Sequence, residues 1–520
     1  MDRLRPPVAT ILTALILVAA AIESAGIGVP ITGARDTQCA SIARNLGKDG
    51  WKGLFLPRAD FSADGRGTAL MEFPLVSALG ASIREIAPAV GEGAYRIPSM
   101  AFGALAIASL FVIVRRVAGE PAALLAASLL AFSPLQFEMS ASPRPDEAAL
   151  GLTLAAFAMR DQQRPIAAAC LALALLAKTT FAFVLVPWVL LDASGGGHLS
   201  VARLRRIAEY LAVVLPVALW HAHAAHVNAE SFLMGDLTVA EAAADYAWQK
   251  GRVGFFVRFA WYARIGERLL AAATAAGTIL ALAGILVLRR RREAIRIVVA
   301  FGAGVLTLLA AFPWHAYDHH YYILFALPLT TLLGGLALDS VRRVFHGWTG
   351  LALVVAAVFL VPASGVSTAI RAMRSVDRST VQFGEAARSV LPEDALLIVS
   401  APFIGTWDAS LLYRAERRGW RYSTQTLDES DPRAMTRLAR AREERRAILP
   451  GRRRVPYPVS RAHSLTPEVI EFLRKKGAAF FAYAGPLEQL QAEKPDVAEH
   501  LAARYPLVHC NAVASFFDLR

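Results

Sequence analysis

Long apolar blocks separated by short polar segments constrain the fold of this chain more than any other feature of its sequence. A helix needs about 17–25 apolar residues to cross the roughly 30 Å hydrocarbon core of a bilayer. Runs that approach or exceed this length cover 8–31, 97–117, 121–139, 207–227, 266–288, 295–312, 320–338 and 347–364. Because backbone N–H and C=O groups in lipid need internal partners, the chain is predicted to be an all-α polytopic membrane bundle.

The distribution of basic residues predicts the topology of this bundle. The chain has a net charge of +13, and its basic residues fall in short clusters between the apolar blocks. This pattern indicates positive-inside topology and not nucleic-acid binding. The clusters are Arg115/Arg116, Arg160/Arg164, Arg203/Arg205/Arg206, Arg289–Arg292 and Arg342/Arg343. Lys178 interrupts the apolar region 165–192. The basic clusters all lie on the same side of the membrane only if this region forms two short helices that each count as a crossing. We therefore expect about eleven crossings in a bacterial inner membrane, with a cytoplasmic N-terminus and a periplasmic C-terminal domain.

The N-terminal run could be taken for a secretory signal peptide, because Arg3 and Arg5 precede it. Its apolar character continues through Ile31, which favours an uncleaved first span.

Polar segments long enough to carry function lie on the outer face of this topology. The first exoplasmic loop, 32–96, holds two amphipathic stretches, 37–47 and 72–87, that are expected to lie on the membrane surface. The tail alternates strand-like and helical stretches, which predicts a small soluble α/β domain: Leu396–Ser400, 408–418, 433–446, 466–476 and Ala478–Tyr483. The chain thus divides into a transmembrane domain over 1–364 and an exoplasmic domain over 375–520.

The spacing of cysteine and histidine indicates no metal site. The three cysteines, Cys39, Cys170 and Cys510, form no CxxC motif, and no histidine stands at a zinc-site spacing from them. A disulfide between Cys39 and Cys510 on the oxidising side stays open.

Two acidic residues of the first loop are candidates for chemistry. Asp36 directly follows the first crossing, where a partly desolvated carboxylate would suit a general base. The alternative is that Asp36 caps the helix expected at 37–47. Glu72 precedes the second amphipathic stretch, where a negative charge also favours the helix dipole, so both residues keep a structural alternative.

A second group of charged residues lies at the edges of apolar runs. Arg144 and Asp146 stand in an exoplasmic turn that Pro143 and Pro145 stiffen, and charges in such positions usually face a cavity or each other. A ligand contact and a structural ion pair are equally compatible with this pattern. Lys178 is isolated within apolar sequence, so it must either snorkel to the surface or meet an anion such as a phosphate.

The segment Trp314–Tyr322 combines aromatic residues with three histidines and an aspartate. Tryptophan and tyrosine are ordinary at membrane interfaces, but an aromatic belt does not explain the histidines. His315 and His319 would suit a metal only if the turn were helical. We expect His319, His320, Tyr321 and Tyr322 to bind phosphate or sugar hydroxyls instead.

Taken in order, these motifs resemble those of the GT-C superfamily of membrane glycosyltransferases, in the branch similar to bacterial protein O-mannosyltransferases and lipid A aminoarabinose transferases. The resemblance covers roughly residues 1–340. It rests on Asp36 and on the segments Glu72–Leu75, Tyr95–Ser99, Ser142–Asp146, Leu176–Thr179 and His319–Pro328. The family usually has a second acid after the first, and this chain has Thr37 at that position.

The resemblance implies a GT-C-like enzyme that moves a sugar from a polyprenyl-phosphate donor to an acceptor hydroxyl at the exoplasmic face, with inversion at the anomeric carbon. It casts Asp36 as the base. It casts several further residues as donor-phosphate ligands: Arg96, Arg144, Lys178, His320 and Tyr321. Other site candidates are Glu72, Asp146, His319 and Tyr322. No cofactor is implied, a divalent metal ion stays an open alternative, and the acceptor (protein, lipid A or glycan) is not identified.

Two other functions are compatible with a chain that has many membrane spans and few charges within them. A transporter or flippase usually shows related halves and polar residues near mid-membrane, whereas this sequence shows no repeat and crowds its polar residues on one face. A non-catalytic envelope assembly protein would use its tail to bind a partner and would not depend on Asp36. We therefore place sugar transfer first.

Overall fold

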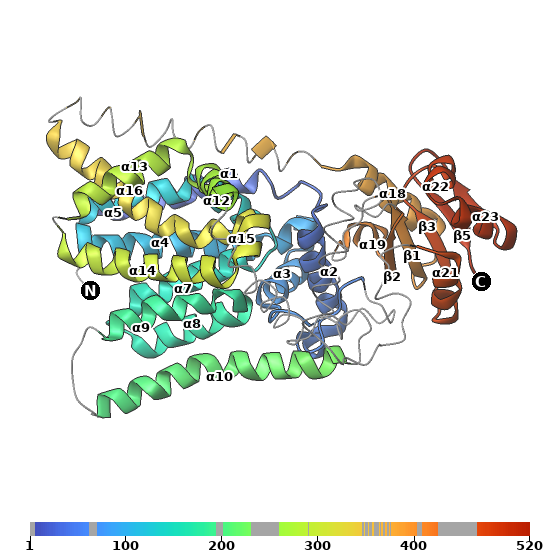
Figure 1. Cartoon of the computed structure of the whole chain (residues 1–520), viewed down its shortest axis with the longest axis horizontal. Helices are drawn as coiled ribbons and strands as arrows, with labels where there is room; N and C mark the ends of the chain where they lie inside the picture. The colour runs from blue at the N-terminus through green and yellow to red at the C-terminus, as the bar shows by residue number, and fades with distance from the viewer. Residues whose placement is uncertain are drawn as a thin grey trace. The chain divides into compact units, whose positions relative to one another are not determined.

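The computed structural model describes two compact units, coloured along the chain in Figure 1. The described residues are 6–61, 70–193, 201–229, 259–289, 291–345, 376–402, 408–424 and 465–520, with single positions between 348 and 374. The helical unit comprises Met1–Val29, Ile86–His221 and Arg252–Ser375. The sheet unit comprises Pro30–Glu85, Ala222–Gly251 and Val376–Arg520.

The helical unit is a bundle in which long apolar helices pack side by side (Figure 1). Its α-helices are α1 Pro6–Ser24, α4 Ile97–Ala118, α5 Glu120–Ala131, α6 Pro134–Ser140, α7 Asp146–Met159, α8 Arg164–Ala177, α9 Leu185–Ala193, α10 Val201–Ala229, α12 Phe259–Ala273, α13 Ala275–Leu288, α14 Arg292–Ala311, α15 Pro313–Asp318 and α16 Leu327–Val344. Short 3₁₀ segments are η2 Pro88–Tyr95, η3 Thr179–Val184 and η6 His320–Ala326. The last turns of α10 belong to the sheet unit. The predicted fold class is confirmed.

Several helices are long and apolar enough to cross a membrane. Among the described residues these are five: Pro7–Ser24, Ile97–Ala118, Arg206–Asn228, Arg292–Ala311 and His320–Val344. Two bent helix pairs raise the number to seven if each pair is one span. The comparison with the expected eleven crossings is partial, because α8 and α9 are shorter and most of the predicted block 347–364 lies outside the described residues. The predicted loop 228–265 also lies mostly outside them.

The region around Lys178 forms two short helices, as the charge distribution predicts. Helix α8 ends at Ala177, Lys178 adopts an extended backbone conformation, and η3 leads into α9. The break therefore gives the one basic residue of this apolar region a non-helical position.

Two other apolar blocks, predicted as continuous spans, are broken in the structure. The block 121–139 bends by 64° between α5 and α6, where Pro134 excludes helical hydrogen bonding with the preceding turn. The block 266–288 bends by 102° between α12 and α13, at Thr274, whose φ of 65° is rare for a residue other than glycine. Both blocks are helical as predicted, and the structure adds a bend within each.

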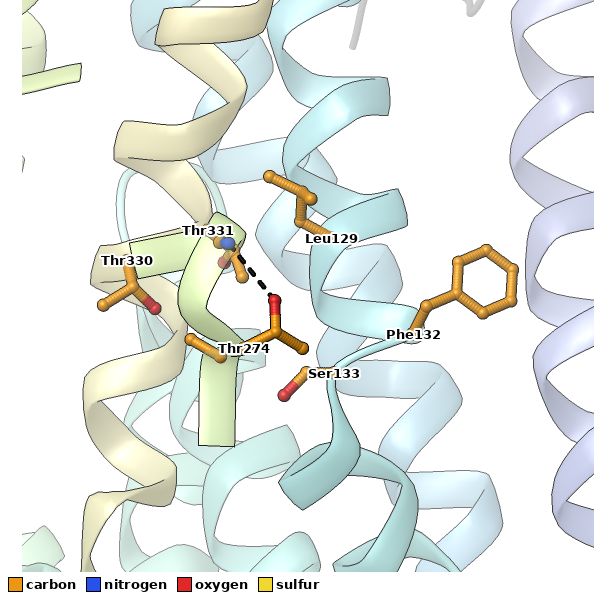
Figure 2. A pocket seen from close by; sticks show the side chains of 8 residues that line it. Leu129, Phe132, Ser133, Thr274, Thr330 and Thr331 are labelled. Carbon is orange, nitrogen blue, oxygen red and sulfur yellow. Dashed lines mark hydrogen bonds between the residues drawn. The ribbon is translucent and has the colours of Figure 1, made fainter. Parts of the chain in front are cut away.

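Side-chain hydroxyls satisfy backbone groups at the two breaks, and Figure 2 shows the hydroxyls that gather there. Ser133 donates to the carbonyl of Ala272 at 2.6 Å, and Thr274 accepts from the Gly277 N–H at 3.2 Å. Thr330 and Thr331 of α16 complete a cavity of about 10 Å³, which has room for about one water molecule. The side chains therefore replace hydrogen bonds that a continuous helix would have made.

The sheet unit is built on five strands in the order β2-β1-β3-β5-β4. Strands β1 Leu396–Ala401, β2 Arg418–Ser423 and β3 Phe480–Tyr483 run parallel, and β5 Ser515–Asp518 runs antiparallel to both of its neighbours, β3 and β4 Leu507–Cys510. The helices of the tail are α18 Arg378–Val390, α19 Ser410–Ala415, α21 Pro467–Lys475, α22 Leu487–Glu493 and α23 Pro495–Arg504.

Both faces of this sheet are covered. Leu397 and Val399 of β1 belong to one apolar cluster with residues of α18 and α19, whereas Ile398 belongs to a second cluster with α21, α22 and α23. Successive residues of a strand point to opposite faces, so a strand buried on both sides has no polar alternation. The run Leu396–Ser400 is such a strand.

The tail predictions are partly confirmed. The two strand-like runs are β1 and β3, and the stretch 466–476 is α21. The stretch 408–418 is helical only over Ser410–Ala415, because Glu416 adopts a left-handed conformation and β2 begins two residues later. The stretch 433–446 lies outside the described residues.

The first loop packs with the tail, a relationship that the sequence pattern does not show. It contains α2 Ala34–Asp49, η1 Gly50–Leu54 and α3 Leu75–Ile86. Buried Asp60 is held by Arg44 and by Asn45, at 3.0 Å from the Asn45 amide nitrogen. Arg414 of α19 donates to the carbonyl of Ile31. Residues 30–61 are therefore part of the core of the sheet unit.

All three cysteines are free. Cys39 is buried and Cys510 is exposed, so the disulfide left open by the sequence is absent.

We predict that Gly419→Ala destabilises the sheet unit. A Cβ at this position would lie 1.9 Å from the carbonyl oxygen of Leu397 on the neighbouring strand, and the Gly419 N–H also bonds Asp60. Relieving that overlap requires a backbone shift, with an expected loss of roughly 1–3 kcal/mol of folding free energy. Thermal unfolding of the purified protein measures it.

Gly47→Ala on α2 is the matched control, because a Cβ there meets nothing within 4 Å. Its helical position should make alanine neutral or slightly stabilising. Equal unfolding temperatures for the two variants would contradict the predicted overlap.

Candidate functional site

The turn before α7 and the break after α8 bring two candidate residues together in the helical unit. Pro143 and Pro145 end the preceding segment, so that α7 begins at Asp146. The Lys178 ammonium lies 2.9 Å from Oδ1 of Asp146, and both side chains are almost fully buried. An ammonium group can reach a carboxylate in this apolar region because the backbone of Lys178 is extended and not helical.

Tyr321 joins this ion pair to Arg144. The Lys178 ammonium lies 5.0 Å from the centre of the Tyr321 ring, and the Arg144 guanidinium lies 5.7 Å from it. His319 stacks on the same tyrosine with ring centres 5.2 Å apart. Ser99 at the start of α4 donates to the Arg144 carbonyl at 3.2 Å, which fixes the turn. Five of the predicted site residues thus form one cluster, which we call the Tyr321 cluster (Arg144, Asp146, Lys178, His319 and Tyr321).

The other predicted residues of this segment lie beside the cluster. His320 is partly exposed and pairs with Glu138 of α6 at 2.8 Å. Tyr322 packs against His315 at 5.4 Å between ring centres. The side chains of Trp314 and Asp318 lie outside the part of the chain whose side chains the structure describes. Glu138 was not singled out from the sequence.

Arg96 makes contacts that the sequence did not anticipate. Its side chain is buried and donates to the backbone carbonyls of Gly26, Ile27 and Val29, at 2.9, 3.3 and 2.6 Å. These bonds tie the start of α4 to the chain that leaves α1. They give Arg96 a structural function, and its predicted role toward phosphate stays a prediction.

A buried polar chain lies next to the Tyr321 cluster, and the sequence reasoning missed most of it. Glu147, adjacent to Asp146, accepts from the Gln136 amide at 2.5 Å, and that amide also lies 3.3 Å from Ser140. Ser140 in turn interacts with Glu23 of α1, a buried acid. Glu23 was detectable, because a carboxylate within an apolar run is a sign of function or internal pairing.

Arg268 is a further cation that the sequence reasoning missed. It is 8% exposed on α12, and this helix packs against α6 and η6, which carry Glu138 and Tyr321. In the sequence it directly follows Glu267, so it lacks the isolation that singled out Lys178.

The two acidic candidates of the first loop belong to the sheet unit. Asp36 lies half-buried in the first turn of α2, with Gly33 as the residue before the helix. Glu72 forms an ion pair with Arg35 at 2.6 Å, and Arg35 also contacts Gln38. Arg35 is thus a partner for Glu72 that the sequence reasoning did not name.

Within the described residues, no group of three or more histidine, cysteine, aspartate or glutamate side chains is arranged to hold a metal ion. The carboxylates of the Tyr321 cluster and its surroundings are instead engaged by lysine, amide and hydroxyl groups.

Comparisons with known proteins agree with these features. The family model described as dolichyl-phosphate-mannose-protein mannosyltransferase matches residues 73–226, a stretch that contains Arg96, Arg144, Asp146 and Lys178. No curated protein sequence matches the chain.

Solved structures of membrane glycosyltransferases share the fold. ArnT from Cupriavidus metallidurans in the apo state is 14% identical, with 98% of this chain and 97% of that chain covered and a TM-score of 0.63. The same protein bound to undecaprenyl phosphate is 15% identical, with 98% of each chain covered and a TM-score of 0.63. The oligosaccharyltransferase AglB from Archaeoglobus fulgidus, in complex with an inhibitory peptide and a dolichol-phosphate, is 12% identical, with 92% and 69% covered and a TM-score of 0.54.

The predicted resemblance is confirmed by the sequence match and by a shared fold that covers the tail as well as the bundle. Residues 73–226 of the chain thus match the mannosyltransferase model, the whole chain shares the fold of these solved structures, and its described part has five helices that are long and apolar enough to cross a membrane.

Proposed function

We propose that the chain transfers a sugar from a polyprenyl-phosphate donor to an acceptor hydroxyl, and that the Tyr321 cluster binds the donor phosphate. The donor class is supported by two similar structures, whose proteins were solved with undecaprenyl phosphate and with dolichol-phosphate. The fold and the residues 73–226 that match the mannosyltransferase model support the transfer reaction.

The proposal rests on one observation above all, which is that two cationic side chains lie close to the same aromatic ring. Lys178 and Arg144 come from different breaks in the bundle and both lie within 6 Å of the Tyr321 ring centre. Asp146 pairs with Lys178 at the start of α7, and Arg144 places a second cation on the same ring. A helix N-terminus adds a partial positive charge and is a favourable place for a phosphate.

The reaction requires a balanced exchange of bonds. The acceptor oxygen forms a bond to the anomeric carbon, and the bond from that carbon to the phosphate oxygen breaks. The acceptor proton passes to a base, and the departing polyprenyl phosphate gains negative charge. Lys178 and Arg144 would stabilise that charge most where it is greatest, in the transition state.

We assign the base to Asp36, on the resemblance of its position after the first helix to that of the family's acid. In this assignment the Asp36 carboxylate accepts the acceptor proton as the new bond forms. Its half-buried position in the first turn of α2 leaves the carboxylate partly accessible. Inversion at the anomeric carbon follows the family and is part of the proposal.

The orientation and the acceptor are further parts of the proposal. The N-terminus is cytoplasmic and the sheet unit periplasmic in a bacterial inner membrane, in keeping with the clusters of arginine between the spans. The tail docks an acceptor protein, lipid A or glycan. Because Phe61 and Ala59 share a core with β1 and β3, deleting the tail would expose this core, so point variants are the appropriate test.

The rival functions fit less well. The breaks at Ser133 and Thr274 are of a kind found in transporters, but the cavity between them has room for about one water molecule and not for a sugar or lipid headgroup. An assembly protein without catalysis would not explain a buried lysine and a half-buried arginine against the same tyrosine.

We predict that Asp36→Asn abolishes sugar transfer and spares donor binding. Loss of a general base typically costs about 10²–10⁴-fold in rate. The measurement is transfer of radiolabelled sugar from cell-derived polyprenyl-phosphate donors into envelope fractions at equal membrane expression. Asp49→Asn on the same helix, an acid paired with Arg58, is the control. Undiminished transfer by Asp36→Asn would reject the assignment.

We predict that Arg144→Gln weakens binding of polyprenyl phosphate about tenfold or more, because one of the two cations on Tyr321 is lost. Equilibrium binding of the labelled lipid phosphate to purified protein measures this. Arg116→Gln, an exposed arginine of α4, should bind normally. Equal affinities for the two variants would remove Arg144 from the phosphate site.

We predict that the Lys178–Asp146 pair is strongly coupled in stability. Lys178→Met leaves a buried carboxylate without its cation and should cost roughly 3–5 kcal/mol. The double variant Lys178→Met/Asp146→Asn should recover a large part of this loss. Thermal unfolding of the four proteins tests it, and additive losses would show that the two groups do not interact.

A further inference from the structure

Helix α16 has two polar ends, and the end away from η6 carries a second cationic cluster. Asp339, one turn from the end of α16, is 1% exposed. Its carboxylate is contacted by Arg342 at 3.1 Å, by Arg343 at 2.8 Å and by Arg291 at 3.5 Å. Arg291 also donates to the Ala118 carbonyl at the end of α4. We call these four residues the Asp339 cluster.

The Asp339 cluster carries an excess of positive charge. Three guanidinium groups surround one carboxylate, and each guanidinium has about five N–H donors. The contacts shown within the described residues use fewer than half of these donors. The Arg342 and Arg343 side chains are 43% and 55% exposed, so their remaining donors face outward.

A comparable group in the same unit is closer to neutral. Asp192 binds Arg160, Arg164 and Tyr210, and Arg164 also binds Glu209. The two acids there offset most of the arginine charge, and both arginine side chains are no more than 25% exposed. The Asp339 cluster is therefore distinguished by its uncompensated charge and by its exposure.

The position of the Asp339 cluster matches the headgroup level of a membrane. Helix α16 has 18 residues, which rise about 27 Å, close to the thickness of the hydrocarbon core. Tyr321 precedes one end and Asp339 lies near the other, so the two clusters belong to opposite membrane surfaces. Val344, Phe345 and Trp348 follow the arginines and are 70%, 48% and 86% exposed, as expected of interfacial anchors.

An apolar surface suited to acyl chains adjoins the arginines. Helix α13 packs along α16, and its Leu282, Ile285 and Leu286 are 61%, 51% and 73% exposed. In a bilayer these side chains contact lipid tails. A phosphate in front of the arginines would thus stand at the head of a chain-lined surface.

We propose that the Asp339 cluster is a binding site for an anionic diacyl phospholipid, with its phosphate on Arg342 and Arg343 and its acyl chains along α13. Asp339 holds the guanidinium groups in position and leaves a net positive charge for the lipid. The site is separate from the Tyr321 cluster, and the inference does not rest on the proposed sugar transfer.

The test uses the full-length protein and lipids of one chain composition. We expect native mass spectrometry to show that wild-type protein retains phosphatidylglycerol in preference to phosphatidylcholine. This preference should fall as the salt concentration rises, because exposed charges are screened. Each arginine near a membrane surface contributes about 1 kcal/mol toward anionic lipid, so Arg342→Gln/Arg343→Gln should reduce the preference about tenfold or more.

Arg264→Gln/Arg296→Gln is the matched control. These arginines are 42% and 48% exposed and each pairs with a glutamate one turn away, so the double variant loses the same charge from comparable positions. It should retain the preference for phosphatidylglycerol. An equal loss in both double variants would show a general charge effect and overturn the site.

Two measurements on wild-type protein keep the proposal falsifiable even if a variant does not fold. Equal retention of phosphatidylglycerol and phosphatidylcholine would overturn it. Inorganic phosphate at millimolar concentration should not raise the unfolding temperature as phosphatidylglycerol does, because it lacks acyl chains. If phosphate alone gives the same stabilisation, the cluster is a site for soluble anions and the lipid proposal fails.

Discussion

The requirement that backbone polar groups in a membrane have partners governs the rest of this structure. Continuous helices meet it internally, and most of the bundle does so. At Ser133, Lys178 and Thr274 the helices break, and local side chains or short 3₁₀ segments supply hydrogen-bond partners for the backbone there. The breaks are costly in lipid, and one of them places Lys178 beside Asp146. The candidate site thus depends on the helix break at Lys178, in a region where a continuous helix would have satisfied its backbone groups internally.

Charge within the bundle follows from the same requirement. A buried lysine needs an anion, and Asp146 supplies it from the start of a neighbouring helix. The guanidinium of Arg144 lies against the same tyrosine, so two cations share one aromatic ring. At the other end of α16, Asp339 organises three arginines in a similar way. In both clusters a buried carboxylate holds a cationic side chain in position.

The sheet unit shows how a soluble domain and a membrane-proximal loop share one core. Strand β1 is buried on both faces, and residues 59–61 of the first loop close one side of it. Arg44, Asp60 and Asn45 connect α2 to this core through buried hydrogen bonds. The helix that carries Asp36 is therefore held by residues more than 350 positions away, such as Tyr413, whose carbonyl accepts from Arg44. This arrangement makes the first loop and the tail a single folding unit.

The sequence by itself determined the helical membrane architecture, the break at Lys178 and two strands of the tail. It also singled out Arg144, Asp146, Lys178 and Tyr321 as site candidates. Apolar length, charge isolation and strand periodicity are local properties, so they can be read along the chain. Only the tertiary structure decided that Lys178 pairs with Asp146, that Arg96 holds the end of α1, and that residues 30–61 pack with the tail. Those outcomes depend on which distant segments meet, and hydrogen-bond and ion-pair partners far apart in the chain leave no periodic signal. The bends at Ser133 and Thr274 were missed for the same reason, because each is stabilised by a partner in the other broken helix or in its own first turn.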